Sequence, residues 1–327
     1  MPRLGLPREI PSDNDIPATL IGYISVQGPE SVFGGKDHRL NQTAKAYHAS
    51  QQDRDDARHD LEKSGFTIIA ESSLGFSASA PGGAFEEITG GTLKAKERLT
   101  IVDPSYSVYV THIDIVGDHQ PTTLGVGRTA SESLKVDGVV IEKPRVYQQV
   151  FPSPIPPNSP KYHLRLPEDV ALALNAAAAN QRGERGAGIS IAMPDSGQYR
   201  HPFFTAHGYT IRRPITVVPG TNPSRDPIGH GTGESANIFA MAPGADLQPI
   251  RASDNAGNLV GAIAGLLRAK ELRPRIITNS WGSDGPYPPP SPPGEDDLAI
   301  ATEILARIMH EVGGCGVIHW NRVGFGC

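Results

Sequence analysis

Two stretches of the chain show regular patterns of hydrophobic and polar positions. In the first stretch, short apolar or alternating runs predict strands, and polar segments with helical spacing predict helices. Glycine, proline and serine mark the ends of these segments, as at Ser64-Gly65 and Pro81. The expected elements are, in order, a strand at 19–26, a helix at 41–64, strands at 66–72 and 75–80, a helix at 81–91 and a strand at 93–102.

The order of these elements is β-α-β-β-α-β, which is typical of a small α+β domain of the ferredoxin-like type. An unrelated small α+β module is the alternative. We therefore expect a loose tail rich in proline and charge at 1–18, followed by a first domain at 19–103.

Residues 104–160 have a weaker pattern. Apolar runs at 105–117 and 136–151 are candidate strands. The segment 151–160 contains five prolines in ten residues, which is typical of an extended connector. We expect a second domain after this connector, at 161–327.

The second stretch alternates between strand-like and helical segments. Short apolar strands separated by helices predict a parallel sheet covered on both faces. The fold class expected for the chain is therefore α/β, with a doubly wound parallel sheet preceded by the small α+β domain. The expected strands are 188–193, 245–252, 275–281 and 316–320, and the expected helices are 170–181, 231–242, 258–272 and 295–312.

Composition narrows the function classes. The 327 residues include 30 Lys and Arg against 35 Asp and Glu, a formal net charge of −5, whereas nucleic-acid-binding domains carry a basic excess. No apolar run reaches about 18 residues, so we expect no membrane span. The N-terminus has no apolar segment of a secretory signal, which makes the cytoplasm the default location. The two cysteines, Cys315 and Cys327, are no disulfide framework.

Three polar motifs stand at the predicted carboxyl ends of strands, where open parallel sheets form their sites. The first contains Asp195, in Met-Pro-Asp-Ser-Gly. The second contains His230, in a Gly-rich turn that opens a helix. The third is Asn-Ser-Trp-Gly at 279–282. Taken singly, each has an ordinary explanation as a turn former, a loop histidine or a plain sheet edge.

Taken together, the motifs resemble those of the subtilisin-like serine proteases. IAMPDSGQYRHPFF (191–204) is similar to the aspartate segment of that family, and GHGTGESANIFAMAPGADL (229–247) is similar to its histidine segment. IITNSWG (276–282) resembles the segment that lines the substrate cleft. The order of the three also agrees with the family. The ferredoxin-like unit upstream is similar to the family's inhibitory, fold-assisting propeptide.

The resemblance implies a role for each motif residue. His230 would be the general base, because an imidazole titrates near neutral pH. Asp195 would accept the Nδ1 proton of His230 and hold its tautomer. Gly231 would leave room for the substrate backbone. The segment expected to pair with an extended peptide or protein substrate comprises Ser280, Trp281 and Gly282.

The chain also departs from the family pattern. No Gly-Thr-Ser-x-x-x-Pro segment, which holds the family's nucleophilic serine, occurs in the 327 residues. Asn321, next to the strand expected at 316–320, is the candidate for the family's oxyanion asparagine. We therefore expect a truncated protease that is inactive as given. The serines inside the motifs that do not match the nucleophile pattern are Ser196, Ser235, Ser280 and Ser283.

Other functions stay open at this stage. One alternative is a degenerate, non-catalytic relative of the proteases that binds peptides or a partner protease. Another is an unrelated Rossmann-like enzyme, although the chain lacks the G-x-G-x-x-G turn of that class. His230 and Glu234 share a helix face but have no second histidine at zinc-site spacing. We expect no metal and no cofactor, with calcium left open by the resemblance alone. The expected partners are a peptide or protein substrate and the chain's own propeptide-like domain.

Overall fold

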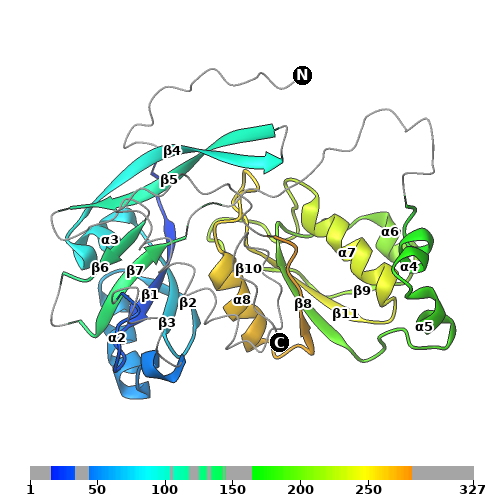
Figure 1. Ribbon diagram of the computed structural model, residues 1–327, viewed down its shortest axis with the longest axis horizontal. Coiled ribbons are helices and arrows are strands. Elements are labelled where there is room, and N and C mark those ends of the chain that lie inside the picture. Colours follow the sequence, from blue (N-terminus) through cyan, green and yellow to red (C-terminus); the bar gives the residue numbers. More distant parts are fainter. Residues whose placement is uncertain are drawn as a thin grey trace. The chain divides into compact units, whose positions relative to one another are not determined.

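The computed structural model describes residues 16–33, 44–103, 106–117, 125–130, 134–142, 144 and 164–281. The chain divides into two compact units (Figure 1): unit 1 comprises Met1–Val146, Val260–Leu267 and Gly282–Cys327, and unit 2 comprises Tyr147–Leu259 and Arg268–Trp281. The expectations that lie outside the described residues are most of the tail at 1–18, the connector at 151–160, the helix at 295–312 and the strand at 316–320.

Unit 1 is built on a five-stranded sheet in the order β2-β3-β1-β7-β6, and every pairing in it is antiparallel. β1 lies in the middle of the sheet, and all seven of its residues are buried, as expected for a continuous apolar run. The strands predicted at 19–26, 66–72 and 75–80 are confirmed. The strands are β1 (Leu20–Val26), β2 (Thr67–Glu71), β3 (Gly75–Ala80), β6 (Val126–Arg128) and β7 (Val136–Ile141).

Two α-helices pack on this sheet, α2 (Gln51–Lys63) and α3 (Gly82–Thr89). α2 begins ten residues later than predicted because Ser50 caps it, its Oγ accepting the N–H of Asp53 at 3.0 Å. A short 3-10 helix precedes it. The core shared by the sheet and both helices includes Ile24, Leu61, Phe66, Phe76, Phe85, Ile88 and Val139.

The strand predicted at 93–102 forms, but outside this sheet. β4 (Thr92–Asp103) and β5 (Tyr106–Val116) make a separate two-stranded antiparallel sheet, and β7 takes the place beside β1. The prediction that 93–102 completes the β-α-β-β-α-β sheet is therefore wrong. The side chains give the reason. β7 is a largely buried apolar run. Lys94 and Lys96 of β4 are exposed, as expected for a strand in an antiparallel sheet with one face open to solvent.

Glu142, directly after β7, joins two segments of unit 1 that are far apart in the sequence. Its buried carboxylate accepts the N–H of Ile263 at 3.0 Å and that of Ala264 at 3.3 Å. These donors belong to the first turn of α8 (Ala262–Glu271), where N–H groups have no partner within the helix. Residues 260–267 are accordingly part of unit 1.

Unit 2 contains the predicted parallel sheet. Its order is β10-β11-β8-β12, with β9 also pairing with β11, and all of these pairings are parallel. β9 and β10 were not predicted, and β12 is shorter than the strand predicted at 275–281. The strands are β8 (Ser190–Asp195), β9 (Thr210–Ile211), β10 (Ile215–Thr216), β11 (Asp246–Arg251) and β12 (Ile276–Ile277).

The helices of unit 2 agree with the prediction only in part. The single helix predicted at 170–181 is two helices, α4 (Glu168–Ala173) and α5 (Ala177–Gln181). The break contains Asn175 with φ at 62°, a left-handed conformation that asparagine adopts more readily than most residues. The helix predicted at 231–242 is confirmed as α7 (His230–Met241), and α6 (Pro202–Ala206) was not predicted.

One hydrophobic cluster joins β8, β11, α6 and α7. Its buried members include Met193, Phe204, Phe239 and Leu247. The ring of Phe239 stacks on that of Tyr209 with centroids 4.5 Å apart. These contacts press α7 against β8 and thereby fix where the first residue of α7 lies.

The strand order reverses direction at β8. From β8 the chain passes through α7 to β11 on one side, and later reaches β12 on the other side of β8. Such reversal points are the usual place for a ligand outside the carboxyl ends of parallel strands. In unit 2 these ends carry Asp195 and residues 278–281.

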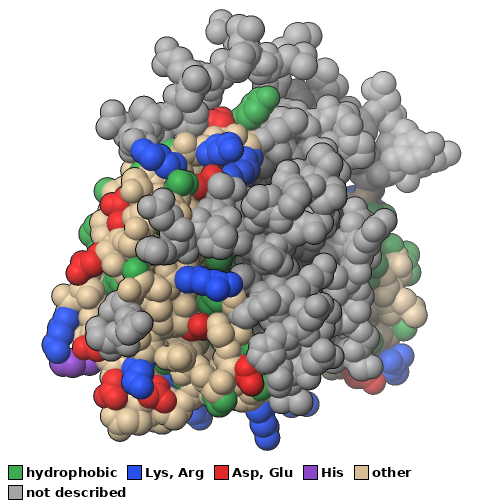
Figure 2. Space-filling model, turned by 60° about the vertical axis from the view of Figure 1, so that its left-hand side comes forward, with side chains coloured by type: hydrophobic (Ala, Val, Ile, Leu, Met, Phe, Trp, Pro, Cys, Tyr) green, Lys and Arg blue, Asp and Glu red, His purple; other side chains and the backbone are tan. Residues whose placement is uncertain are grey.

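Figure 2 shows one face of the protein, on which the described Lys and Arg side chains are interspersed with Asp and Glu. The described hydrophobic side chains form small separate areas there. Over the described ranges, no helix has both the length and the apolar character needed to cross a membrane.

Replacing Phe239 by alanine should lower the free energy of unfolding of unit 2 by about 3–5 kcal/mol, because a buried ring is lost and a cavity remains. Leu172→Ala is the matched control: Leu172 is 72% exposed, and we expect a change within about 0.5 kcal/mol. Hydrogen exchange of the β8 and β11 amides in a urea series measures both. Equal, small effects would contradict the packing described for α7.

Candidate active site

The side chains of Asp195 and His230 meet at the carboxyl end of β8. Asp195 is the last residue of β8 and His230 the first of α7. The distance from His230 Nδ1 to Asp195 Oδ1 is 2.8 Å. A carboxylate only accepts hydrogen bonds, so Nδ1 carries the proton and Nε2 of the neutral ring carries the lone pair. The sequence motifs at 191–204 and 229–247 therefore converge on one hydrogen-bonded aspartate–histidine pair.

Backbone conformation brings the two residues together. Gly229, before His230, has φ at 78°, which suits glycine. Gly231, after it, has no room for a side chain: an added Cβ would lie 2.3 Å from the carbonyl oxygen of Gly197 and 3.1 Å from Asp195 Oδ1. The first turn of α7 can therefore lie directly against the end of β8.

His230 is held in an acidic environment. Its side chain is 11% exposed and that of Asp195 is 1% exposed. Burial disfavours the imidazolium and lowers the pKa of His230, but the hydrogen bond to Asp195 and the charges of Asp195, Glu234 and Asp226 outweigh it. The net result is a pKa above the ordinary value of 6.5. The site thus stabilises a proton on His230, as a general base requires once it has accepted one.

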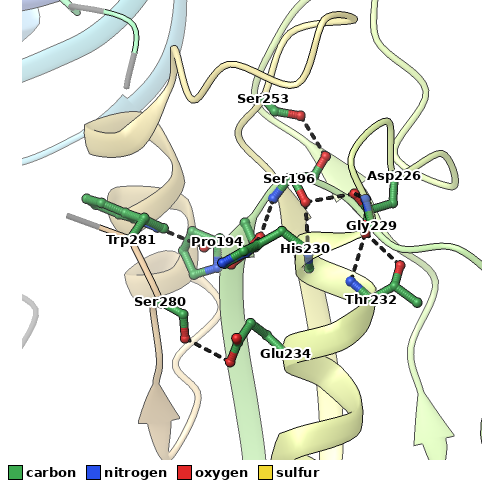
Figure 3. Close-up of polar contacts among 12 residues, drawn as sticks. Pro194, Ser196, Asp226, Gly229, His230, Thr232, Glu234, Ser253, Ser280 and Trp281 are labelled. Atoms are coloured by element: carbon green, nitrogen blue, oxygen red, sulfur yellow. Dashed lines mark hydrogen bonds and ion pairs between the residues drawn. The ribbon is translucent and has the colours of Figure 1, made fainter. Parts of the chain in front are cut away.

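The segment after β12 is tied to both neighbouring elements (Figure 3). The Oγ of Ser280 donates to the carboxylate of Glu234 on α7 at 3.1 Å. The indole N–H of Trp281 donates to the carbonyl oxygen of Pro194 on β8 at 3.0 Å. Two residues predicted to line a substrate site therefore lie beside the elements that carry Asp195 and His230.

The other predicted residues have different outcomes. Gly231 is buried, and the carbonyl of Gly197 fills the space beside it. A glycine is needed there because a side chain would collide with the chain's own backbone. Gly282 and Asn321 lie outside the described residues. The serines Ser196 and Ser235 are fully buried and bonded to Asp226 and Gln198. Ser283, the last of the motif serines, is also outside the described residues.

Sequence reasoning missed Asp226, which lies in the loop before α7. Its carboxylate accepts the N–H and the Oγ–H of Thr232, the N–H of Gly229 and the Oγ–H of Ser196. An acidic residue shortly before a Gly-rich helix start is a recognisable capping signal. The role of Ser196 could not be found this way, because its partners are 30 and 35 residues away in the sequence.

Metal binding has no support within the described ranges, where no group of three or more His, Cys, Asp and Glu side chains could hold an ion. Glu234, which shares a helix face with His230, is hydrogen-bonded to Ser280.

Comparison with known proteins finds a distant similarity to subtilisins. The chain is 29% identical over 154 residues to subtilisin BL of Lederbergia lenta. It is 28% identical over the same length to subtilisin Savinase of that organism and to an alkaline protease of Alkalihalobacillus alcalophilus. This chain is similar to subtilisins. No family model matches it.

The similarity to the subtilisins is distant and partial. It covers 44% of this chain, 54% of each of the two subtilisins and 38% of the alkaline protease. The chain therefore spans about half the length, or less, of these curated relatives. The subtilisin likeness and the parallel sheet of unit 2 are consistent with one another.

Removing the partner of His230 should lower its pKa. In Asp195→Asn, burial of the imidazole is no longer offset by the adjacent carboxylate, so the pKa of His230 should fall below that of the unaltered protein. Glu234→Gln should lower it in the same direction and by less, since Glu234 acts through charge alone. NMR titration of the histidine ring signals measures both shifts.

The stability of the unaltered protein should depend on pH through the raised pKa of His230. The pKa of His230 is raised in the folded state, so the pair stabilises fully below pH about 6.5 and loses this contribution as the pH rises through the folded pKa. Glu271→Gln is the control, because Glu271 is exposed and pairs with Arg268 on α8. An unchanged His230 titration in Asp195→Asn would show that the pair does not form in solution.

Proposed function

We propose that unit 2 carries the acid–base pair of a subtilisin-like serine endopeptidase, with His230 as general base and Asp195 as its partner. The observation that carries the proposal is the 2.8 Å contact between His230 Nδ1 and Asp195 Oδ1 at the carboxyl end of a parallel strand. The likeness to the subtilisins over 44% of the chain supports it.

In the proposed reaction His230 transfers one proton in each half. Nε2 takes the proton of a serine hydroxyl as its oxygen attacks the peptide carbonyl, and then gives it to the leaving amine as the C–N bond breaks. In the second half Nε2 takes a proton from water, which attacks the acyl-enzyme, and returns it to the serine oxygen. Asp195 stays ionised and stabilises the imidazolium formed in each half.

The serine nucleophile is not found in this sequence by its family pattern. The 327 residues contain no Gly-Thr-Ser-x-x-x-Pro segment. The described motif serines Ser196, Ser235 and Ser280 bond to Asp226, Gln198 and Glu234. We therefore expect this polypeptide by itself to hold two of the three groups of the triad and not to hydrolyse peptides.

The proposed substrate is an extended peptide that lies along residues 280–282 as an added strand. Trp281 supports this, since its indole is fixed to Pro194 and so presents a rigid surface next to the acid–base pair. We further propose that residues 19–103 form a propeptide-like domain, which is a second partner of the catalytic domain at 161–327.

A second candidate function is a non-catalytic protein that binds peptides or a partner protease. The absence of a family-type serine segment from the sequence favours it. The two functions share the peptide-binding surface and differ in chemistry, so one set of measurements separates them.

A fluorophosphonate probe and a casein digest test the chemistry. We expect no labelled protein and no released peptides. Labelling and hydrolysis that both disappear in His230→Ala would establish an endopeptidase and show that a serine outside the family pattern is the nucleophile. Inhibition of an added subtilisin by the full chain would favour the binding function.

Fluorescence anisotropy with dye-labelled casein peptides tests the shared surface. We expect binding that Trp281→Ala weakens about tenfold, because loss of an aromatic anchor from a binding surface costs about 1.4 kcal/mol or more. Leu172→Ala, at an exposed position of α4, should leave binding unchanged. If the protein neither binds peptides nor reacts with the probe, both proposed functions are overturned.

A further inference from the structure

Asp226 is the point at which the loop before α7 is tied to the acid–base pair. Its Oδ1 accepts the Oγ–H of Ser196 at 2.7 Å and the N–H of Gly229 at 2.9 Å. Its Oδ2 accepts the N–H of Thr232 at 2.8 Å and the Oγ–H of the same residue at 2.6 Å. One carboxylate thus holds a residue adjacent to Asp195 and two residues that flank His230 (Figure 3).

Ser196 extends this connection to the backbone on the other side of His230. Its Oγ donates to Asp226 and accepts the N–H of Gly231 at 2.8 Å. Its own carbonyl oxygen accepts the hydroxyl of Ser253 at 2.6 Å, and its N–H donates to Asp195 Oδ1 at 2.6 Å. Asp195 and the first turn of α7 are therefore held by a shared set of hydrogen bonds in addition to their direct contact.

Arg251, at the end of β11, holds the loop that delivers Asp226. This arginine is 1% exposed. Its guanidinium donates to the carbonyl oxygens of Asn222 at 2.7 Å and Arg225 at 3.3 Å. It also donates to the carbonyl oxygens of Ser253 and Asp254. Arg225 directly precedes Asp226, so the loop position is fixed from the sheet.

We propose that Asp226 is a positioning residue, which acts through Ser196 and the first turn of α7 to set the orientation of Asp195 and His230. As a statement about catalysis this rests on the proposed function. The geometry that it fixes is measurable whether or not the protein is a peptidase.

Position and charge must be separated in the test. Three carboxylates act on His230: Asp195 from β8, Asp226 from the loop and Glu234 from α7. Removing the charge of Asp226 would by itself lower the pKa of His230. Ser196→Ala is therefore the critical variant, because it breaks the link between Asp226 and Gly231 while all three charges remain.

The experiment is an NMR titration of the histidine rings in the full 327-residue chain. We expect both Asp226→Asn and Ser196→Ala to lower the pKa of His230 and to speed exchange of its Nδ1 proton about fivefold, the change that corresponds to one hydrogen bond of about 1 kcal/mol. The double variant should exceed the larger single effect only slightly, since both substitutions interrupt one path.

Asp246→Asn is the matched control, since it removes a half-buried aspartate of the same unit that pairs with Arg212; His230 should not respond to it. A lower melting temperature in Ser196→Ala with an unaltered His230 titration and exchange rate would overturn the proposal and leave Asp226 a purely structural residue. The proposed peptidase function would survive that result. Conversely, a protein without peptidase activity can still show the predicted shifts.

Discussion

The end of β8 is the constraint on which the arrangement of unit 2 depends. β8 pairs with β11 on one side and β12 on the other, and α7 is pressed against it by the cluster around Phe239. The backbone of Gly231 lies so close to that of Gly197 that a single methyl group would collide with it. Neighbouring elements are therefore positioned by their contact with one residue, Asp195, and by the backbone around it.

Charge near this point is unevenly distributed. Asp226 has both oxygens saturated by donors, whereas Asp195 Oδ2 has no hydrogen-bond partner among the described residues. The buried guanidinium of Arg251 is bonded chiefly to backbone carbonyls. The carboxylates therefore favour the protonated form of His230, whereas the charge of Arg251 is directed at the carbonyls of the loop before α7.

Local signals made much of this fold predictable. The buried run of β1, the alternation of strands and helices in unit 2 and the three motifs were all readable from spacing, because each reflects one element. The strand that pairs with β4 could not be predicted from the sequence, because the choice between β1 and β5 depends on contacts that form only in the folded chain. The roles of Asp226 and Ser196 likewise required the loop, β8 and α7 in three dimensions, whereas Asp195 and His230 stood out through their glycine-rich surroundings.

Pro194 has a consequence for the edge of the sheet. β12 keeps register with β8 through Ile277, and the N–H of Thr278 bonds to the carbonyl of Ala192. Proline has no N–H with which to extend that ladder, and its carbonyl is taken by the indole of Trp281. Pro194 therefore ends the hydrogen-bond ladder between β8 and β12 at Thr278, and the next contact along the described chain is made by a side chain, the indole of Trp281.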